Sequence, residues 1–213
     1  NAKGILVNQV FPNSTASALD LKIGDIILEI NGQSVSDMPS LMAARNEMRG
    51  GQMTEMTVWR DGKNVKLRGE AAAVPKETSD VSEVIYDEIP YKNGWLRVIV
   101  SKPNPNIALG EEKHPTIFFI PGYTCASVDN FSPIHPYGKL LDSLSGLGYA
   151  IFRVEKPGMG DNVNTGDCFQ MGFDQELEAY KVAYRNLKKY DFLDLENVHV
   201  LGHSMGGVYA PLI

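Results

Sequence analysis

The sequence has no run of apolar residues long enough to span a bilayer, so we expect no transmembrane helix. It also lacks an excess of basic residues, because 20 Lys and Arg stand against 26 Asp and Glu, a net charge of -6. Neutralising phosphates requires clustered positive charge, so nucleic acid is not an expected partner. The only two cysteines, Cys125 and Cys168, fit neither the spacing of a zinc site nor a Cys-x-x-Cys redox pair. We therefore expect no metal and no cofactor.

The N-terminus, Asn1 to Gly4, has neither an initiator methionine nor the basic and then apolar profile of a signal peptide. Asn1-Ala2 is consistent with the scar of an expression tag, so we expect the natural protein to begin before this sequence. Any export signal would then also lie outside it, and localisation has to be argued from other features.

Residues 4–69 are expected to form a small β-rich domain with two short helices. Asp61-Gly62 accepts positive φ in a two-residue turn and predicts a hairpin. Residues 14–19 and the segment around Pro39, which occupies a first-turn position, predict the helices. Apolar runs bounded by turn residues predict strands at 4–10, 25–30, 53–60 and 63–68.

Segment 71–80 has no sustained periodicity and contains Pro75 and small polar residues. We interpret it as a linker between one domain at 1–70 and a second at 81–213.

The second domain opens with a predicted hairpin across Asn93-Gly94 and then changes pattern. Apolar runs separated by helical stretches are typical of a mostly parallel sheet buried on both faces, so we expect an α/β fold with flanking helices. The runs lie at 116–120, 149–154 and 198–201.

Two helices between these runs are expected to be scaffold. One has an apolar face from Ile134 to Leu147, and the other has an apolar face from Phe173 to Leu187. Early acids such as Glu176 in the second helix match the favourable end of the helix dipole.

The strongest chemical signal is Gly-His-Ser-Met-Gly at 202–206, directly after the apolar run 198–201. A serine in a tight turn between a strand and a helix is exposed to substrate, and the flanking glycines remove Cβ atoms that would clash. The helix after the turn directs unpaired N–H groups at the site. We therefore predict Ser204 as a nucleophile and the Met205 N–H as an oxyanion donor. The alternative is a glycine-rich turn with an incidental serine.

A second oxyanion donor is expected from the loop after the strand at 116–120, where Tyr123 follows Pro121-Gly122. The Tyr123 N–H is the candidate donor. Without the serine motif, an ordinary Pro-Gly turn explains these residues equally well.

Residues 84–213 resemble the N-terminal half of an α/β-hydrolase. The order of Pro121-Gly122-Tyr123, the glycines at 158 and 160 and the serine motif carries this resemblance. In that family the loop after the fourth strand often reads Asp-x-x-Gly-x-Gly-x-Ser, whereas here it begins Glu155-Lys156, so the glycines match and the polar positions differ.

The resemblance implies that an acid and a histidine follow the serine in the sequence. Only residues 205–213 follow Ser204, and they contain no Asp, Glu or His. We therefore expect a chain truncated at its C-terminus that is inactive as a fragment, because a serine without a base is a weak nucleophile. By the family pattern His203 points into the interior, and His199 lies in a buried strand. His135 is the one histidine placed to approach the pocket, but a surface or capping role is the expectation for it.

The family's sheet order places the loops that carry Cys125 and Cys168 at the same edge, so a disulfide between them is one expectation. Two unrelated free thiols are the other.

Residues 4–69 are similar to PDZ domains of the bacterial envelope-protease type, as shown by the run from Gly4 through Gly24-Asp25 to Asn31-Gly32. That family binds peptides by strand addition beside its helix. Its carboxylate-binding loop and strand precede the part that matches Gly4, so we expect weak or no peptide binding.

The sequence as a whole predicts a serine hydrolase that cleaves an ester or related acyl bond through an acyl-enzyme on Ser204. The alternatives are a non-catalytic PDZ-bearing scaffold protein with a degenerate hydrolase domain, and a serine peptidase. The PDZ resemblance and the cysteine pair favour a periplasmic or secreted location.

Overall fold

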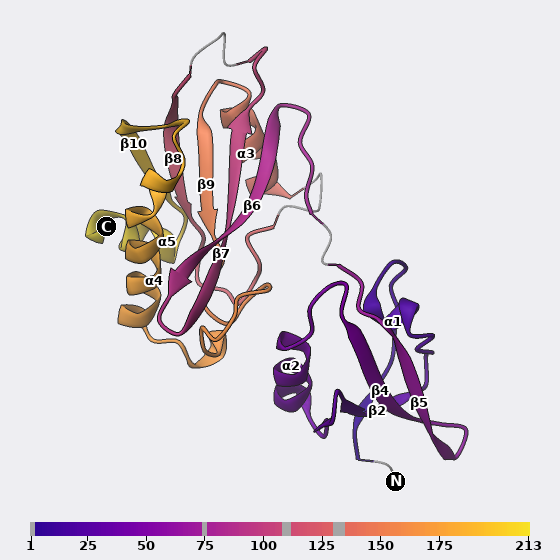
Figure 1. The fold of residues 1–213 in the computed structure, drawn as a ribbon. Coiled ribbons are helices and arrows are strands. Elements are labelled where there is room, and N and C mark those ends of the chain that lie inside the picture. Colours follow the sequence, from indigo (N-terminus) through magenta and orange to yellow (C-terminus); the bar gives the residue numbers. More distant parts are fainter. Residues whose placement is uncertain (1–2, 74–75, 108–111, 130–134) are drawn as a thin grey trace. The chain divides into compact units, whose positions relative to one another are not determined.

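The chain divides into two compact units, Asn1–Pro75 and Lys76–Ile213. The structure, a computed structural model, describes residues 3–73, 76–107, 112–129 and 135–213 (Figure 1). The division falls inside the segment predicted as a linker. Ala71 is still bound to the first unit, through its N–H to Gln52 O at 2.8 Å, whereas Glu77 is ion-paired with buried Arg153 of the second unit.

The first unit is an antiparallel sheet with two short helices. Strand order is β1-β2-β4-β5, and β3 also pairs with β2. The sheet and helices enclose a core that includes Leu19, Ile30 and Val58. The elements are β1 (Ile5–Leu6), α1 (Thr15–Ala18), β2 (Ile26–Ile30), β3 (Gln33–Ser34), α2 (Met38–Asn46), β4 (Met53–Arg60) and β5 (Lys63–Glu70).

Local signals explain most of this unit. Ser14 caps α1 by accepting a hydrogen bond from Ser17 N, and Asp37 and Ser40 form a capping box at the start of α2. Asp61 and Gly62 have φ of 50° and 82°, so the predicted hairpin turn is confirmed.

The first strand is shorter than the predicted range 4–10. After Leu6 the backbone is hydrogen-bonded to the turn at Gly24-Asp25 and no longer to a strand. The Val7 N–H donates to Asp25 O at 2.8 Å, and the Gly24 N–H donates to Val7 O at 2.9 Å.

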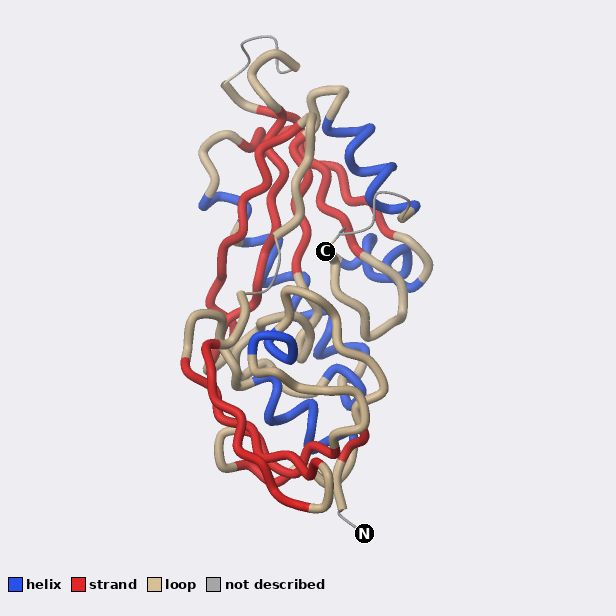
Figure 2. Tube along the Cα trace, turned by 90° about the vertical axis from the view of Figure 1, so that its right-hand side faces the viewer, coloured by secondary structure: helices blue, strands red, loops and turns tan. Residues whose placement is uncertain are grey.

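The second unit contains a mixed five-stranded sheet of order β10-β8-β9-β7-β6, whose strands run side by side (Figure 2). The pairs β10·β8 and β8·β9 are parallel, whereas β7·β9 and β6·β7 are antiparallel. The prediction of a mostly parallel sheet was therefore wrong in this respect, because the opening hairpin supplies two of the five strands. The strands are β6 (Ser82–Tyr91), β7 (Gly94–Pro103), β8 (His114–Ile120), β9 (Ala150–Val154) and β10 (Leu193–Gly202).

Helices cover both faces of this sheet (Figure 1). Successive residues of a strand point to opposite faces. Phe118 and Ile120 of β8 accordingly belong to the core beneath α4 (Phe173–Arg185), and Ile117 and Phe119 pack with α3 (Pro136–Ser145). Ile134, predicted on the face of the first helix, lies outside the described residues.

Strand β10 is paired only with β8 among the described residues and is partly exposed. The prediction of a strand buried on both faces was wrong here, because an edge strand has a neighbour on one side only. His199, predicted to be buried, is exposed beside Tyr149, with ring centroids 6.1 Å apart.

The β6–β7 turn is Lys92-Asn93, one residue earlier than predicted, because Gly94 already pairs with Tyr91. Gly94 has a different reason to be glycine. A Cβ there would lie 1.7 Å from Val163 O, and Trp95 forms an antiparallel bridge with Val163. The loop after β9 is thus bonded to the start of β7.

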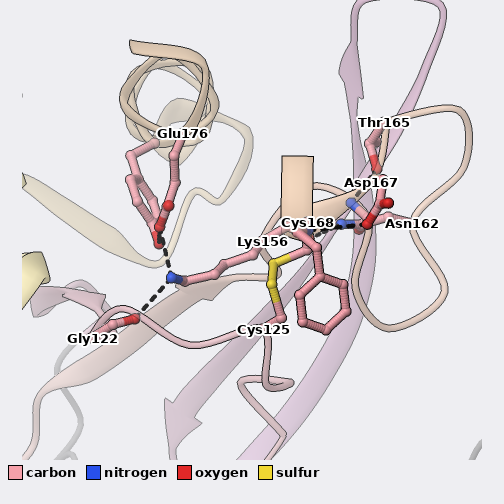
Figure 3. Close-up of a disulfide and its surroundings, with 11 residues drawn as sticks. Gly122, Cys125, Lys156, Asn162, Thr165, Asp167, Cys168 and Glu176 are labelled. Carbon is pink, nitrogen blue, oxygen red and sulfur yellow. Dashed lines mark hydrogen bonds and ion pairs between the residues drawn. A yellow bond between two sulfur atoms is a disulfide. The ribbon is translucent and has the colours of Figure 1, made fainter. Parts of the chain in front are cut away.

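Cys125 and Cys168 form a disulfide (Figure 3). Cys125 lies in the loop after β8, and Cys168 lies in the loop after β9, at the start of the 3-10 helix η1 (Cys168–Gln170). Parallel neighbouring strands end at the same edge of a sheet, so one covalent bond joins the two loops at that edge.

We predict that replacing both cysteines, C125S with C168S, lowers the free energy of unfolding of the second unit by roughly 2 to 4 kcal/mol. The bond closes a loop of 43 residues and so restricts the unfolded chain. The measurement is urea unfolding followed by Trp95 fluorescence in a W59F background, since Trp59 and Trp95 are the only tryptophans. Free thiols in unreduced protein from an oxidising compartment would contradict the expectation.

Candidate functional site

Ser204 lies in a sharp turn between β10, which ends at Gly202, and α5 (Met205–Tyr209). Its side chain is exposed, and its backbone has φ 54° and ψ -120°. L-residues rarely adopt this conformation, and such strain persists only where the surrounding structure enforces it. The turn is the local geometry that the Gly-His-Ser-Met-Gly motif predicts, and the catalytic role of Ser204 stays a prediction.

Close backbone contacts enforce the turn. A Cβ on Gly202 would lie 2.2 Å from Gly206 O, and a Cβ on Gly206 would lie 2.2 Å from Ile120 O. Both positions therefore exclude any side chain. The second contact also places the start of α5 against the end of β8.

The loop after β8 lies beside Ser204. A Cβ built on Gly122 would be 3.2 Å from the Cβ of Ser204. The N–H groups of Tyr123 and Met205 have no acceptor among the described residues. Two free donors thus lie in elements that flank one exposed hydroxyl, and their role as an oxyanion hole stays a prediction.

His203 was predicted to point into the interior, and this prediction was wrong: it is exposed, and its Nδ1 lies 2.5 Å from the Oη of Tyr137 of α3. His135 is exposed at the N-cap of α3, as predicted, with its ring 5.1 Å from that of Tyr137. Within the described residues, Ser204 Oγ has no hydrogen bond to a histidine or carboxylate. His135 and His203 thus both lie against Tyr137, and neither is hydrogen-bonded to Ser204 Oγ.

Buried charges lie beneath the loop after β8, and sequence reasoning missed them. Lys156 and Glu176 are 3% and 7% exposed and form an ion pair, with Nζ 2.8 Å from Oε1 (Figure 3). The same Nζ donates to Gly122 O at 2.8 Å. The sequence marked Lys156 only as a departure from a family pattern and Glu176 only as a helix-start acid, because no local pattern predicts a contact between distant residues.

Glu155 is fully buried next to this pair in the chain. It accepts hydrogen bonds from Ser127 Oγ at 2.7 Å and Val128 N at 3.2 Å. The pKa of Glu155 is raised to about 7, chiefly by burial; the Ser127 hydrogen bond opposes this rise, and the nearby Asp129 charge adds to it. The described residues contain no cluster of three or more His, Cys, Asp or Glu side chains able to hold a metal ion.

The raised pKa of Glu155 predicts how stability depends on pH. A folded-state pKa of about 7 against an ordinary 4.5 favours the neutral carboxyl, so its contribution is complete below pH 4.5 and is lost as pH rises through 7. The difference corresponds to up to about 3 kcal/mol. Because Gln mimics the neutral acid, E155Q should become steadily more stable than the wild type from pH 5 to pH 8.

Urea unfolding at a series of pH values, followed by Trp95 fluorescence in the W59F background, measures this difference. E196Q, which changes an exposed acid of the same unit, is the matched control and should run parallel to the wild type. Parallel curves for E155Q and the wild type would refute the raised pKa.

Comparison with known proteins identifies the first unit. Residues 1–69 match the family model of the PDZ domain. The probable periplasmic serine endoprotease DegP-like of Marinomonas sp. (strain MWYL1) is 33% identical over 87 residues, which is 41% of this chain and 19% of that protein. The periplasmic serine endoprotease DegP of Escherichia coli (strain K12) is 33% identical over 82 residues, 38% of this chain and 17% of that protein. The matched part thus spans less than a fifth of these relatives.

Among solved structures, the acylaminoacyl peptidase of Pyrococcus horikoshii superimposes with a TM-score of 0.50 at 16% identity. The match covers 78% of this chain and 26% of that one. At this identity the likeness concerns the fold alone. Residues 1–69 therefore match the PDZ domain and resemble segments of bacterial periplasmic endoproteases, and the fold of most of the chain is like that of the Pyrococcus horikoshii protein.

Proposed function

We propose that this chain carries the nucleophile and oxyanion hole of a serine hydrolase that cleaves an ester or related acyl bond. The observation that carries the proposal is the strained, exposed Ser204 between β10 and α5, with two free N–H donors beside it. Ser204 Oγ attacks the acyl carbon and forms a tetrahedral intermediate, while the hydroxyl proton passes to a general base. When the intermediate collapses, the bond to the leaving oxygen breaks, that oxygen takes up the proton and departs as the alcohol, and an acyl-enzyme remains, which water then hydrolyses.

The Met205 and Tyr123 N–H groups would bind the oxyanion of that intermediate. Each such donor contributes about 3 kcal/mol of transition-state stabilisation. The proposal assigns no base within this chain, because residues 205–213 contain no Asp, Glu or His and no described histidine contacts Ser204.

Two alternatives each have an observation in their favour. The fold likeness to an acylaminoacyl peptidase, together with a PDZ domain similar to those of endoproteases, favours a peptidase. A non-catalytic scaffold protein with a degenerate hydrolase domain is the other alternative, because no described histidine or carboxylate is hydrogen-bonded to Ser204 Oγ. The leading proposal differs from both alternatives in its substrate, a small ester or related acyl compound, since a peptidase cleaves peptides and a scaffold protein cleaves nothing.

We also propose a periplasmic or secreted location. The relatives named above are periplasmic by name, and a disulfide persists in oxidising compartments. None of the helices in the described parts of the chain is both long and apolar enough to cross a bilayer.

We predict that a fluorophosphonate probe labels Ser204 in the protein as encoded by its gene, and that S204A abolishes labelling. S143A, which removes an exposed serine of α3, is the control and should be labelled like the wild type. Hydrolysis of aryl esters beside acyl-peptide anilides then separates an esterase from a peptidase. A wild type that is not labelled would leave the scaffold alternative.

The PDZ domain is predicted to bind extended C-terminal peptides more weakly than micromolar. Strand addition depends on main-chain hydrogen bonds, and β1 spans only Ile5–Leu6. Fluorescence anisotropy of labelled decapeptides, with C-terminally amidated versions as controls, measures this affinity. Saturable micromolar binding that requires the free carboxylate would show the expectation to be wrong.

A further inference from the structure

Lys156 is a buried cation with two partners that lie on either side of it. Its side chain reaches from the end of β9 between Gly122 and Glu176 (Figure 3). The Nζ atom is 2.8 Å from Gly122 O and 2.8 Å from Glu176 Oε1. Burying an ion pair rarely adds stability compared with an apolar pair of the same size, so these contacts call for another explanation.

The Gly122 carbonyl and the Tyr123 N–H belong to one peptide unit. A trans peptide is planar, with its oxygen and its hydrogen on opposite sides. Two groups donate to Gly122 O: Lys156 Nζ at 2.8 Å and the Thr124 N–H at 3.0 Å. Because two donors hold the oxygen, the direction of the Tyr123 N–H is also fixed.

Glu176 joins this peptide to the other side of the site. Its Oε1 accepts from the hydroxyl of Tyr180 at 2.9 Å, and the ring of Tyr180 packs against that of Tyr209, with centroids 5.4 Å apart. Tyr209 is the last residue of α5, the helix that begins with Met205. Through Tyr180, this buried carboxylate therefore lies between the elements that carry the two candidate oxyanion donors.

We propose that Lys156 is a positioning residue of the oxyanion hole, whose ammonium group holds the Gly122 carbonyl so that the Tyr123 N–H faces the oxyanion formed at Ser204. This inference rests on the proposed function and deepens it. The ammonium group also polarises the peptide, which makes the Tyr123 N–H a stronger donor. Glu176 keeps Lys156 in place.

The test variant is K156M combined with E176Q. K156M alone would leave the Glu176 carboxylate buried without its cation, which is strongly destabilising, whereas adding E176Q keeps a neutral partner for Tyr180. E176Q alone is not used as a control, because it would leave the Lys156 ammonium group buried without its anion. K189M is the matched control, because Lys189 also donates to a carbonyl, Glu88 O at 3.1 Å, and pairs with Asp87.

The first readout is independent of activity. Carbonyl-¹³C glycine and ¹⁵N tyrosine label two Gly-Tyr peptides in this sequence, Gly122-Tyr123 and Gly148-Tyr149. In the double variant the Gly122 carbonyl signal should move upfield through loss of the charged donor, and the Gly148 signal should stay in place. K189M should leave both signals near their wild-type positions.

The second readout is the rate of fluorophosphonate labelling of Ser204 in the protein as encoded by its gene, with kcat and KM for an aryl ester. The double variant should react about 10- to 100-fold more slowly, with the loss in kcat and KM little changed, because an oxyanion donor acts in the transition state. K189M should match the wild type.

The two arms separate failure of this inference from failure of the proposed function. A wild type that is not labelled overturns the proposed function, and the positioning role with it. A labelled wild type whose double variant reacts at the same rate, or whose Gly122 carbonyl signal does not move, overturns the positioning role alone.

Discussion

The architecture of the site depends on two positions where no side chain fits. The backbones of β10, α5 and the end of β8 approach so closely at Gly202 and Gly206 that a Cβ on either residue would overlap a neighbouring carbonyl. This approach forces the intervening serine into positive φ and exposes its hydroxyl. The same contact brings the start of α5 to the loop after β8, so strain and proximity have one cause.

Features set by neighbouring residues could be predicted from the sequence. The Asp61-Gly62 hairpin, the helix that begins near Pro39 and the strand, turn and helix around Ser204 all follow from local rules on dihedral angles, helix starts and Cβ clashes. The order of the sheet in the second unit also followed, through the family resemblance, as far as the adjacency of β8 and β9.

Features set by distant partners could not be predicted. Gly122 and Lys156 are 34 positions apart, and Tyr137 and His203 are 66 apart. Hydrophobic periodicity carries no information on which buried cation meets which carbonyl. Glu155 shows the same limit, because the sequence marked it as a polar departure from a pattern, whereas its burial gives it an unusual protonation equilibrium.

Val163, in the connection after β9, forms an antiparallel bridge with Trp95 of β7, so this connection adds one more residue pair to the sheet beside β7. With Asn162 bonded to both the Arg97 N–H and Lys156 O, that connection is anchored from its first residue onward. The loop that carries Cys168 is therefore held against the turn of the β6–β7 hairpin, at the same edge of the sheet. Gly94, next to that turn, sets how closely the hairpin and the loop can approach, because any larger residue would push Val163 away.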